Sequence, residues 1–153
     1  MTRQSAGLLV YRRDRGGVEV FLVHPGGPFW KNKDTHAWSI PKGEFNDETP
    51  VDAAQREFVE ETGQTVSGEF HPLAPLTTGT KTIHAFAVES ATPDPERLRS
   101  NEFELEWPPR SGRTARFPEV DRAAWVPLTD ARERLHRNQQ DLVDQLEALL
   151  GGG

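Results

Sequence analysis

The chain has 153 residues, a length typical of one domain that buries roughly 70% of its unfolded surface. It contains no cysteine, which excludes disulfide bonds, thiolate metal ligands and a thiolate nucleophile. The formal net charge of −6 argues against a general electrostatic affinity for nucleic acid, although it is compatible with a local basic pocket.

Two short apolar runs open the chain. Residues 6–11 and 18–23 flank the stretch Arg-Asp-Arg-Gly-Gly, which predicts a β-hairpin with its turn near residues 14–17. The apolar run at 7–11 is too short for a signal peptide or a membrane span. We therefore expect a cytoplasmic protein without a membrane anchor.

An irregular segment follows this hairpin. Residues 24–37 combine prolines, glycines and charged side chains, a composition that sustains neither a helix nor a strand. Residues 38–40 predict a brief extended segment, which the sequence Pro-Lys-Gly at 41–43 ends. His24, directly before Pro-Gly-Gly, is compatible with a structural role and with a functional one.

The clearest predicted element is a helix from Pro50 to Thr62. Thr49 is a good N-cap, proline is favoured at the first helical position, and Asp52 completes a pair with Thr49 that is similar to a capping box. Gly63 lies where a helix usually ends. Three apolar side chains at helical spacing are expected to face the core: Val51, Ala54 and Phe58.

Strands and loops make up most of the second half. Residues 64–73 and 81–89 predict strands, the second through its alternation of side chains. Residues 91–118 contain five prolines and predict a loop with a strand at Glu102–Trp107. Trp125 and Val126 predict a last short strand.

One amphipathic helix is predicted near the C-terminal end, over residues 129–150, with Thr129 as its cap. Its apolar face is expected to contain Leu142, Leu146 and Leu149 or Leu150. The glycines at 151–153 predict a disordered tail. Because the sequence shows neither a repeat nor a linker, residues 1–150 predict one α/β domain.

Three carboxylates on the predicted first helix form the most informative pattern of the sequence. Glu57, Glu60 and Glu61 stand at positions i, i+3 and i+4, within an arc of roughly 100° on one face. Like charges at these spacings repel, so their clustering favours a compensating cation. A hard divalent ion such as Mg²⁺ takes oxygen ligands and shares them with substrate phosphates. The alternative is a solvated acidic face on which Arg56 pairs with Glu60 at i+4.

Residues 43–63 resemble the Nudix box, the motif GX5EX7REUXEEXGU in which U is an apolar residue. The seven residues between Glu48 and Arg56 match, as do the Arg-Glu-Phe-Val-Glu-Glu core and the closing Gly63. The chain departs from the motif at two positions. Four residues separate Gly43 from Glu48, where the family has five, and glutamine replaces the last apolar residue.

The segment Trp-Ser-Ile-Pro-Lys-Gly at 38–43 is also similar to a Trp-x-x-Pro-Lys-Gly segment of certain Nudix enzymes. Those enzymes act on dinucleoside polyphosphates and on RNA 5′ ends. The resemblance as a whole implies the Nudix fold, an α/β/α sandwich with a mixed, partly antiparallel sheet. It also implies hydrolysis of a nucleoside diphosphate linked to another moiety, with Mg²⁺ as the cofactor and Mn²⁺ as an alternative ion.

The same resemblance assigns roles to residues of the box. Metal ligands are Glu57, Glu60, Glu61 and the backbone carbonyl of Gly43, and Arg56 orients Glu57. The catalytic residues are then Glu57, Arg56 and Glu60. Relatives differ in the general base, which stays open between Glu57 and a loop carboxylate, either Glu119 or Asp121.

Four further residues are candidates for binding the substrate. Lys42 lies beside the box and would hold a phosphate as a point charge, or else is an exposed lysine. Trp107 and Arg110 belong to a segment rich in arginine, which would form a lid with an aromatic platform for a base. The alternative there is a solvated, proline-stiffened loop. Glu119 is the fourth candidate.

Two functions compete. The first is a Mg²⁺-dependent, MutT-like pyrophosphohydrolase of small nucleotide derivatives, with dinucleoside polyphosphates or nucleoside triphosphates favoured over RNA 5′ ends because the net charge is negative. The second is a catalytically silent, nucleotide-binding regulatory module, against which the complete set of box carboxylates argues. Enzymes of this family are often dimers, so a monomer and a homodimer both stay open.

Overall fold

The computed structural model describes residues 3–14 and 16–151, and it begins with the predicted hairpin. Strands β1 (Arg3–Asp14) and β2 (Gly17–Pro25) pair antiparallel, with Asp14 opposite Gly17 at the turn. Gly17 has a φ of 118°, a value that side chains disfavour, so this turn requires a glycine.

Within the described residues, seven strands form the main sheet in the order β4–β6–β1–β2–β9, with β3 paired to β1 and β5 to β6. Strands β1 and β6 run parallel and place Arg3 opposite Lys81, whereas β1–β2 and β2–β9 are antiparallel. The sheet is therefore mixed, as expected. Its other strands are β3 (Lys42–Glu44), β4 (His71–Pro72), β5 (Leu76–Thr78), β6 (Lys81–Glu89) and β9 (Val120–Pro127).

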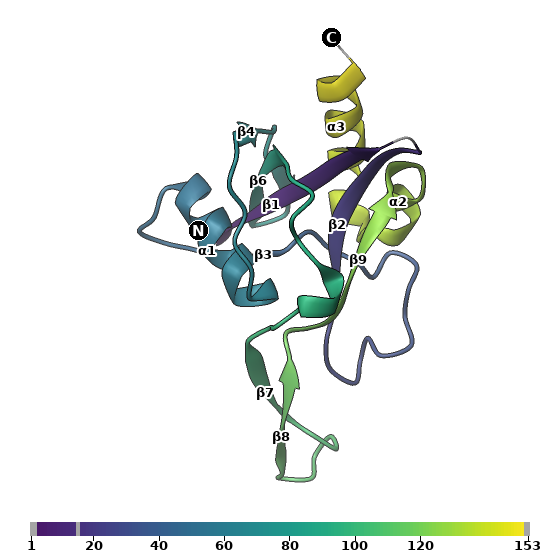
Figure 1. The fold of residues 1–153 in the computed structure, drawn as a ribbon. Coiled ribbons are helices and arrows are strands. Elements are labelled where there is room, and N and C mark those ends of the chain that lie inside the picture. Colours follow the sequence, from purple (N-terminus) through teal and green to yellow (C-terminus); the bar gives the residue numbers. More distant parts are fainter. Residues whose placement is uncertain (1–2, 15, 152–153) are drawn as a thin grey trace.

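Helices cover both faces of the sheet, as Figure 1 shows. Helix α1 (Pro50–Thr62) lies on one side, and α2 (Leu128–Arg134) and α3 (Asp141–Gly151) lie on the other. The expected α/β/α sandwich is thus confirmed.

Strand β1 supplies side chains to two apolar clusters, one on each face. Leu8 and Val10 belong to the cluster that contains Phe58 of α1. Leu9 belongs to the cluster that contains Leu142 of α3. Successive strand residues face opposite sides of a sheet, so a run of consecutive apolar residues is what a strand covered on both faces needs.

Helix α1 has the predicted bounds and the predicted ends. The Thr49 side chain accepts a hydrogen bond from the N–H of Asp52, and Gly63 ends the helix with a φ of 73°. Ala54 and Phe58 are fully buried, as predicted. Val51 is only half-buried, because it lies in the first, more solvated turn.

The strand predicted over residues 64–73 is wrong for most of its length, since only His71–Pro72 is a strand there. Gln64 anchors this stretch in another way. Its side chain makes two hydrogen bonds of 2.9 Å with the backbone of Asp94. Gln64 thus forms a polar link where the box motif has an apolar residue, and Val66 enters the core instead.

Two other extended segments are longer than predicted. Residues 41–43 do not end the extended chain, because β3 begins at Lys42 and pairs with β1. Strand β9 spans eight residues rather than only Trp125 and Val126, because β2 offers it an antiparallel partner along its length.

The single helix predicted over residues 129–150 is wrong. The chain forms α2, the 3₁₀ helix η2 (Arg137–Gln139) and α3. Trp38 ends α2, because its N–H donates to the carbonyl of Arg134 at 2.9 Å and its carbonyl accepts from His136 at 2.8 Å. The N-cap of α2 is Pro127 rather than Thr129.

Helix α3 keeps part of the predicted apolar face. Leu142 and Leu146 are fully buried and Leu150 is half-buried, whereas Leu149 is exposed. Gly151 is the last residue of α3 rather than part of a tail, and the rest of the predicted tail, residues 152–153, lies outside the described residues.

A second, two-stranded sheet projects from the main body, at the bottom of Figure 1. It consists of β7 (Glu102–Glu106) and β8 (Thr114–Pro118), after the short 3₁₀ helix η1 (Pro95–Arg97). Strand β7 confirms the strand predicted from residue 102, whereas β8 lies in a stretch where the prolines had predicted a loop.

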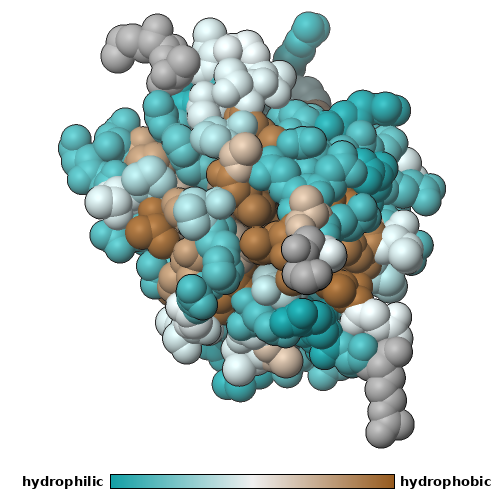
Figure 2. All heavy atoms as spheres, turned by 90° about the horizontal axis from the view of Figure 1, so that it is seen from above, coloured by the Kyte–Doolittle hydropathy of each residue, from teal (hydrophilic) through white to brown (hydrophobic). Residues whose placement is uncertain are grey.

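Polar side chains cover most of the face shown in Figure 2, and apolar side chains gather near its centre. Exposed large apolar side chains among the described residues include Phe29, Val59 and Leu149. In the part of the chain that the structure describes, no helix is both long and apolar enough to cross a membrane.

Candidate active site

The loop before α1 lies against the acidic face of that helix. Gly43 in β3 approaches the carboxyl group of Glu57 so closely that a Cβ atom at position 43 would overlap it. Glu57 is only 7% exposed, although glutamate is rarely buried without a partner. The glycine therefore makes room for a buried carboxylate.

Arg56 connects three acidic side chains. Its Nε and Nη2 donate to Glu48 at 2.6–2.9 Å, and its Nη1 donates to Glu57 at 2.8 Å and to Glu60 at 3.1 Å. The hydrogen bonds from Arg56 hold the pKa of Glu48 below its usual range. Glu48 thus reaches Arg56 despite the one-residue shortening of the loop.

The Arg56–Glu60 pair is the contact that a solvated acidic face would show, yet the rest of the face is not solvated. Burial raises the pKa of Glu57, against the hydrogen bond from Arg56. Burial also raises the pKa of Glu61 to about 8, against the charge and the backbone N–H of Lys42. A bound cation would favour the ionised form of these buried carboxylates and so offset the cost of burying their charge.

The carboxylates of Glu57, Glu60 and Glu61 on α1 are called the acidic group below. Glu119 is distant from them in sequence but lies near them in the fold. Asn101 connects its loop to α1: the N–H of Asn101 donates to the carbonyl of Glu60 at 3.0 Å, and the carbonyl of Asn101 accepts from the N–H of Glu119 at 2.7 Å. Burial and the charge of Glu60 raise the pKa of Glu119. The charge of Glu119 in turn raises the pKa of Glu57 and Glu61.

Asp121 is engaged elsewhere. Its Oδ1 lies 2.8 Å from Nδ1 of His24, a fully buried side chain at the end of β2. Of the two loop carboxylates considered as general base, Glu119 is therefore the one that the structure brings to α1.

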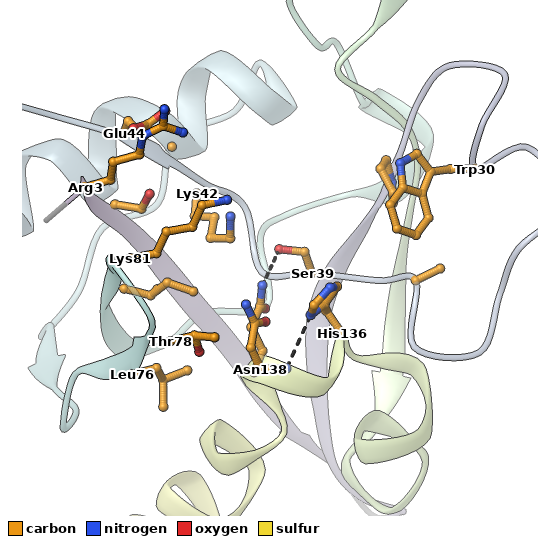
Figure 3. A pocket seen from close by; sticks show the side chains of 16 residues that line it. Arg3, Trp30, Ser39, Lys42, Glu44, Leu76, Thr78, Lys81, His136 and Asn138 are labelled. Atoms are coloured by element: carbon orange, nitrogen blue, oxygen red, sulfur yellow. Dashed lines mark hydrogen bonds and ion pairs between the residues drawn. The ribbon is translucent and has the colours of Figure 1, made fainter.

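A cavity of about 390 Å³ opens beside the acidic group (Figure 3). Lys42 and Gly43 line this cavity, and the same two residues contact the carboxylates of α1. The backbone N–H of Lys42 donates to Oε1 of Glu61 at 3.3 Å, and Gly43 faces Glu57. Cavity and acidic group are thus two parts of one candidate site.

The two ends of the cavity differ in chemistry. In Figure 3, Arg3, Lys42 and Lys81 gather at one end, with Glu44 beside Arg3, and Trp30 stands at the other. Asn138 lies in the wall between them. Its Oδ1 is buried and, among the residues that the structure describes, has no hydrogen-bond partner. Buried polar atoms are rarely left in this state.

Trp107 and Arg110 are not brought to this site. Trp107, directly after β7, packs edge-on against Phe29 with ring centroids 5.5 Å apart. Arg110 is exposed in the turn between β7 and β8. Neither residue lines the cavity.

Sequence reasoning missed most of the cavity wall. The motif predicts Lys42, which adjoins the box, but Arg3, Lys81, Trp30 and Asn138 come from separate parts of the chain. A weak signal existed, since Arg3 and Lys81 each stand at the start of an extended run. Only the parallel pairing of β1 and β6 places them side by side, and the sequence does not show that pairing.

The oxygen donors of the acidic group suit a hard divalent cation. Glu57, Glu60 and Glu61 supply carboxylates, and Gly43 leaves space where a Cβ would intrude. As the side chains stand, Arg56 holds two of these carboxylates. Within residues 3–14 and 16–151, no three acidic or histidine side chains are grouped closely enough to hold a metal ion. A cation that binds here has to compete with Arg56 for Glu57 and Glu60.

A family model described as the NUDIX domain matches residues 1–146, and the chain belongs to this family. Solved structures of the same fold include the Caenorhabditis elegans Ap4A hydrolase in a binary complex, with a TM-score of 0.69, 21% identity, and coverage of 99% of this chain and 100% of that one. The NUDIX domain of Shewanella oneidensis NrtR, complexed with ADP-ribose, has a TM-score of 0.64 and 15% identity over 98% of this chain and 89% of that one.

A third structure of this fold is a MutT protein from a study of Aliivibrio salmonicida and Vibrio cholerae. Its TM-score is 0.57, with 19% identity over 95% of this chain and 96% of that one. A comparison with curated proteins gives no significant match. As a Nudix hydrolase, the chain is an enzyme that acts on phosphoric anhydride bonds, and enzymes of this family generally use divalent metal ions.

Proposed function

We propose that the chain is a Mg²⁺-dependent pyrophosphohydrolase of a nucleotide-derived substrate, with dinucleoside polyphosphates or nucleoside triphosphates as the favoured class. The observation that carries this proposal is the junction of the α1 carboxylates with the cationic end of the cavity, through Lys42 and Gly43. The Ap4A hydrolase and the ADP-ribose complex among the structures of the same fold support a small nucleotide as the substrate.

In the proposed reaction, water attacks one phosphorus of the diphosphate, and the P–O bond to the other phosphate breaks. Glu57, Glu60 and Glu61, with the carbonyl of Gly43, would hold the metal ion. Bound Mg²⁺ supplies charge neutralisation at the pyrophosphate oxygens and a more acidic water. Arg56 fixes Glu57 from the side, and Glu57 or Glu119 accepts the proton that the water loses.

The cationic end suits a chain of several phosphates. Arg3 and Lys81 are register partners on parallel strands, and like charges placed opposite each other destabilise a sheet. A bound polyanion would reverse that cost. Lys42 adds a third cation next to the metal site. Glu44 lines the same end and lies 4.0 Å from Arg3, so Lys42 and Lys81 are the cations that favour a substrate with additional phosphates.

The other end suits a nucleobase. Trp30 offers an aromatic surface on which a ring can stack. The substrate would then run from the carboxylates of α1, along the cations, toward Trp30.

The test of this function is turnover on a panel of substrates. Ap4A, ATP, ADP-ribose and a 5′-triphosphorylated RNA are incubated with Mg²⁺ or Mn²⁺, and the products are separated by chromatography. We expect turnover of at least one nucleotide, abolished by EDTA and lowered by orders of magnitude in Glu60→Gln. Wild-type protein no faster than Glu60→Gln on every substrate would refute the proposal. Calorimetric binding of ADP-ribose without turnover would then support the silent binding module.

A second experiment tests the substrate class. Lys81→Gln should raise KM for Ap4A and ATP by on the order of tenfold, because it removes a charge-assisted contact, and should change KM for ADP-ribose less. Lys31 is exposed and does not line the cavity, so Lys31→Gln is the matched control. Equal effects of Lys81→Gln on all three substrates would contradict the preference for longer phosphate chains.

A further inference from the structure

His24 is fully buried, and both of its ring nitrogens have oxygen partners. Nδ1 lies 2.8 Å from Oδ1 of Asp121, and Nε2 lies 2.5 Å from the backbone carbonyl of Lys33. A carbonyl oxygen and an ionised carboxylate can only accept hydrogen bonds, so both nitrogens must donate. A doubly protonated ring satisfies both acceptors, and its charge would be balanced by Asp121, whose Oδ1 also lies 3.7 Å from Nε of Arg122.

The pairing of β2 with β9 is irregular at this point. His24 lies opposite Arg122, but the next residue, Pro25, lies opposite Val120. Asp121 is therefore the extra residue of a β-bulge. A bulge redirects a side chain out of the regular alternation of a strand, and here it brings Asp121 to the ring of His24.

On the other side of its ring, His24 holds the turn that carries Trp30. The N–H of Lys33 donates to the carbonyl of Trp30 at 3.0 Å, and the carbonyl of Lys33 accepts from His24. The ammonium group of Lys33 also lies 5.2 Å from the centre of the Trp30 ring. The backbone N–H and the backbone carbonyl of Lys33 are thus both hydrogen-bonded. Trp30 reaches the cavity from this turn.

The loop of Glu119 meets the end of β2 beside the same ion pair. The N–H of Gly26 donates to the carbonyl of Glu119 at 2.9 Å. A Cβ atom on Gly26 would overlap the carbonyl of Pro118, so the two backbones are in direct contact. The loop of Glu119 is in turn connected to α1 through Asn101, whose backbone hydrogen-bonds to both Glu60 and Glu119.

We propose that His24 and Asp121 form a buried, charged clamp that fixes two loops of the site at once. One loop places Trp30 at the nucleobase end of the cavity, and the other places Glu119 beside the carboxylates of α1. His24 touches neither substrate nor metal in this scheme, so it is a positioning residue. Its effect on turnover rests on the proposed function, whereas the clamp itself does not.

The charge state of His24 is tested by NMR of the ring nitrogens at neutral pH. In the wild-type protein, both nitrogens of His24 should be protonated. In Asp121→Asn, the new side-chain NH₂ can donate to Nδ1, so the ring should keep one proton and both hydrogen bonds. A His24 ring with a single proton in the wild-type protein would overturn the charged clamp.

The clamp is tested by amide hydrogen exchange in the metal-free, substrate-free protein. His24→Gln should speed exchange at the amides of Lys33 and Gly26 by on the order of tenfold or more, because the ring that hydrogen-bonds to both Asp121 and Lys33 is lost. The amide of Phe58 in α1 should not change. Asp121→Asn should exchange like the wild-type protein, and His71→Gln, which removes a histidine outside the cavity, is the matched control.

Two results would overturn the clamp: slow exchange at Lys33 and Gly26 in His24→Gln, or an equal rise at Phe58, which would show a general loss of stability. With Ap4A as the substrate, His24→Gln should lower kcat/KM by on the order of tenfold, whereas Asp121→Asn should keep most of the wild-type kcat/KM. If the wild-type protein turns over no substrate, the proposed function fails, and the exchange measurements still decide on the clamp.

Discussion

Gly43 shows how one missing side chain shapes the candidate site. The carboxyl group of Glu57 occupies the space that a Cβ at position 43 would need. Glu57 can therefore be buried against β3 and still accept a hydrogen bond from Arg56. Gly43 lines the cavity and also contacts the Glu57 carboxylate, so it links the cavity to the acidic group.

Gly43→Ala should lower turnover by orders of magnitude, because the added methyl group displaces the Glu57 carboxylate from its position. Turnover of the best panel substrate is measured with saturating Mg²⁺. Gly151→Ala is the matched control, since a Cβ there meets nothing within 4 Å. A Gly43→Ala enzyme with near-normal turnover would show that the close approach of Gly43 to Glu57 has no catalytic role.

Glu61 should make the stability of the metal-free protein depend on pH. Its pKa of about 8 in the folded state, against an ordinary 4.5, favours the protonated form there. Its contribution to stability is therefore fully present below the ordinary pKa and is lost as the pH rises through about 8. In EDTA, the wild-type Tm should fall across this interval, and Glu61→Gln should flatten the fall. Parallel curves for the two proteins would show that Glu61 ionises freely.

At the scale of elements, the sequence predicts those whose signals are local. Helix α1 has its cap, its proline and its closing glycine in adjacent positions, and β6 has its alternation. Elements decided by distant partners are not predictable in this way. Trp38 interrupts the C-terminal helix through backbone hydrogen bonds from a residue far away in the chain. Strand β9 contains charged residues and is extended because β2 pairs with it.

The residues of the candidate site fall into the same two classes, those with a local sequence signal and those that distant pairing brings together. Lys42, Gly43 and the residues of α1 are close in sequence, so their motif predicts them together. Glu119 is predicted from its place before the last strand, although its contact with α1 depends on Asn101. Arg3 and Lys81 meet only because β1 and β6 are parallel, and no local pattern encodes that pairing.

Gln139 links the broken C-terminal segment to the sheet. Its Oε1 accepts from the N–H of Ile40 at 3.1 Å, and its Nε2 donates to Oγ of Ser39 at 3.0 Å. Gln139→Leu should lower the free energy of unfolding by about 1–3 kcal/mol, because a buried N–H loses its partner. Urea denaturation measures the change. Gln145→Leu, which removes hydrogen bonds to Ala74 at an exposed position, should cost less. Equal losses would contradict this reasoning.

At the scale of the whole molecule, charge is distributed unevenly. The chain carries a formal charge of −6, yet three cationic side chains gather at one end of the cavity beside the acidic group of α1. A polyanionic substrate therefore meets a local field of the opposite sign to that of the protein as a whole. A divalent cation adds to this local field.

Mg²⁺ should stabilise the folded protein as a whole, because an ion that binds only the folded state shifts the unfolding equilibrium by mass action. We expect the wild-type Tm to rise with Mg²⁺ concentration, and Glu57→Gln to remove most of that rise. Scanning calorimetry of both proteins, with EDTA as the reference, measures the shift. Equal shifts in the two proteins would place the stabilising ion outside the acidic group.

The position of β1 in the sheet has a consequence for biosynthesis. The neighbour β2 is synthesised directly after β1, but the parallel partner β6 begins only at residue 81. Until then, one edge of a strongly apolar strand stays open to other extended chains. A nascent chain of this protein therefore has a long interval of exposure, and a chaperone that covers the first hairpin would act on the segment most prone to aggregate.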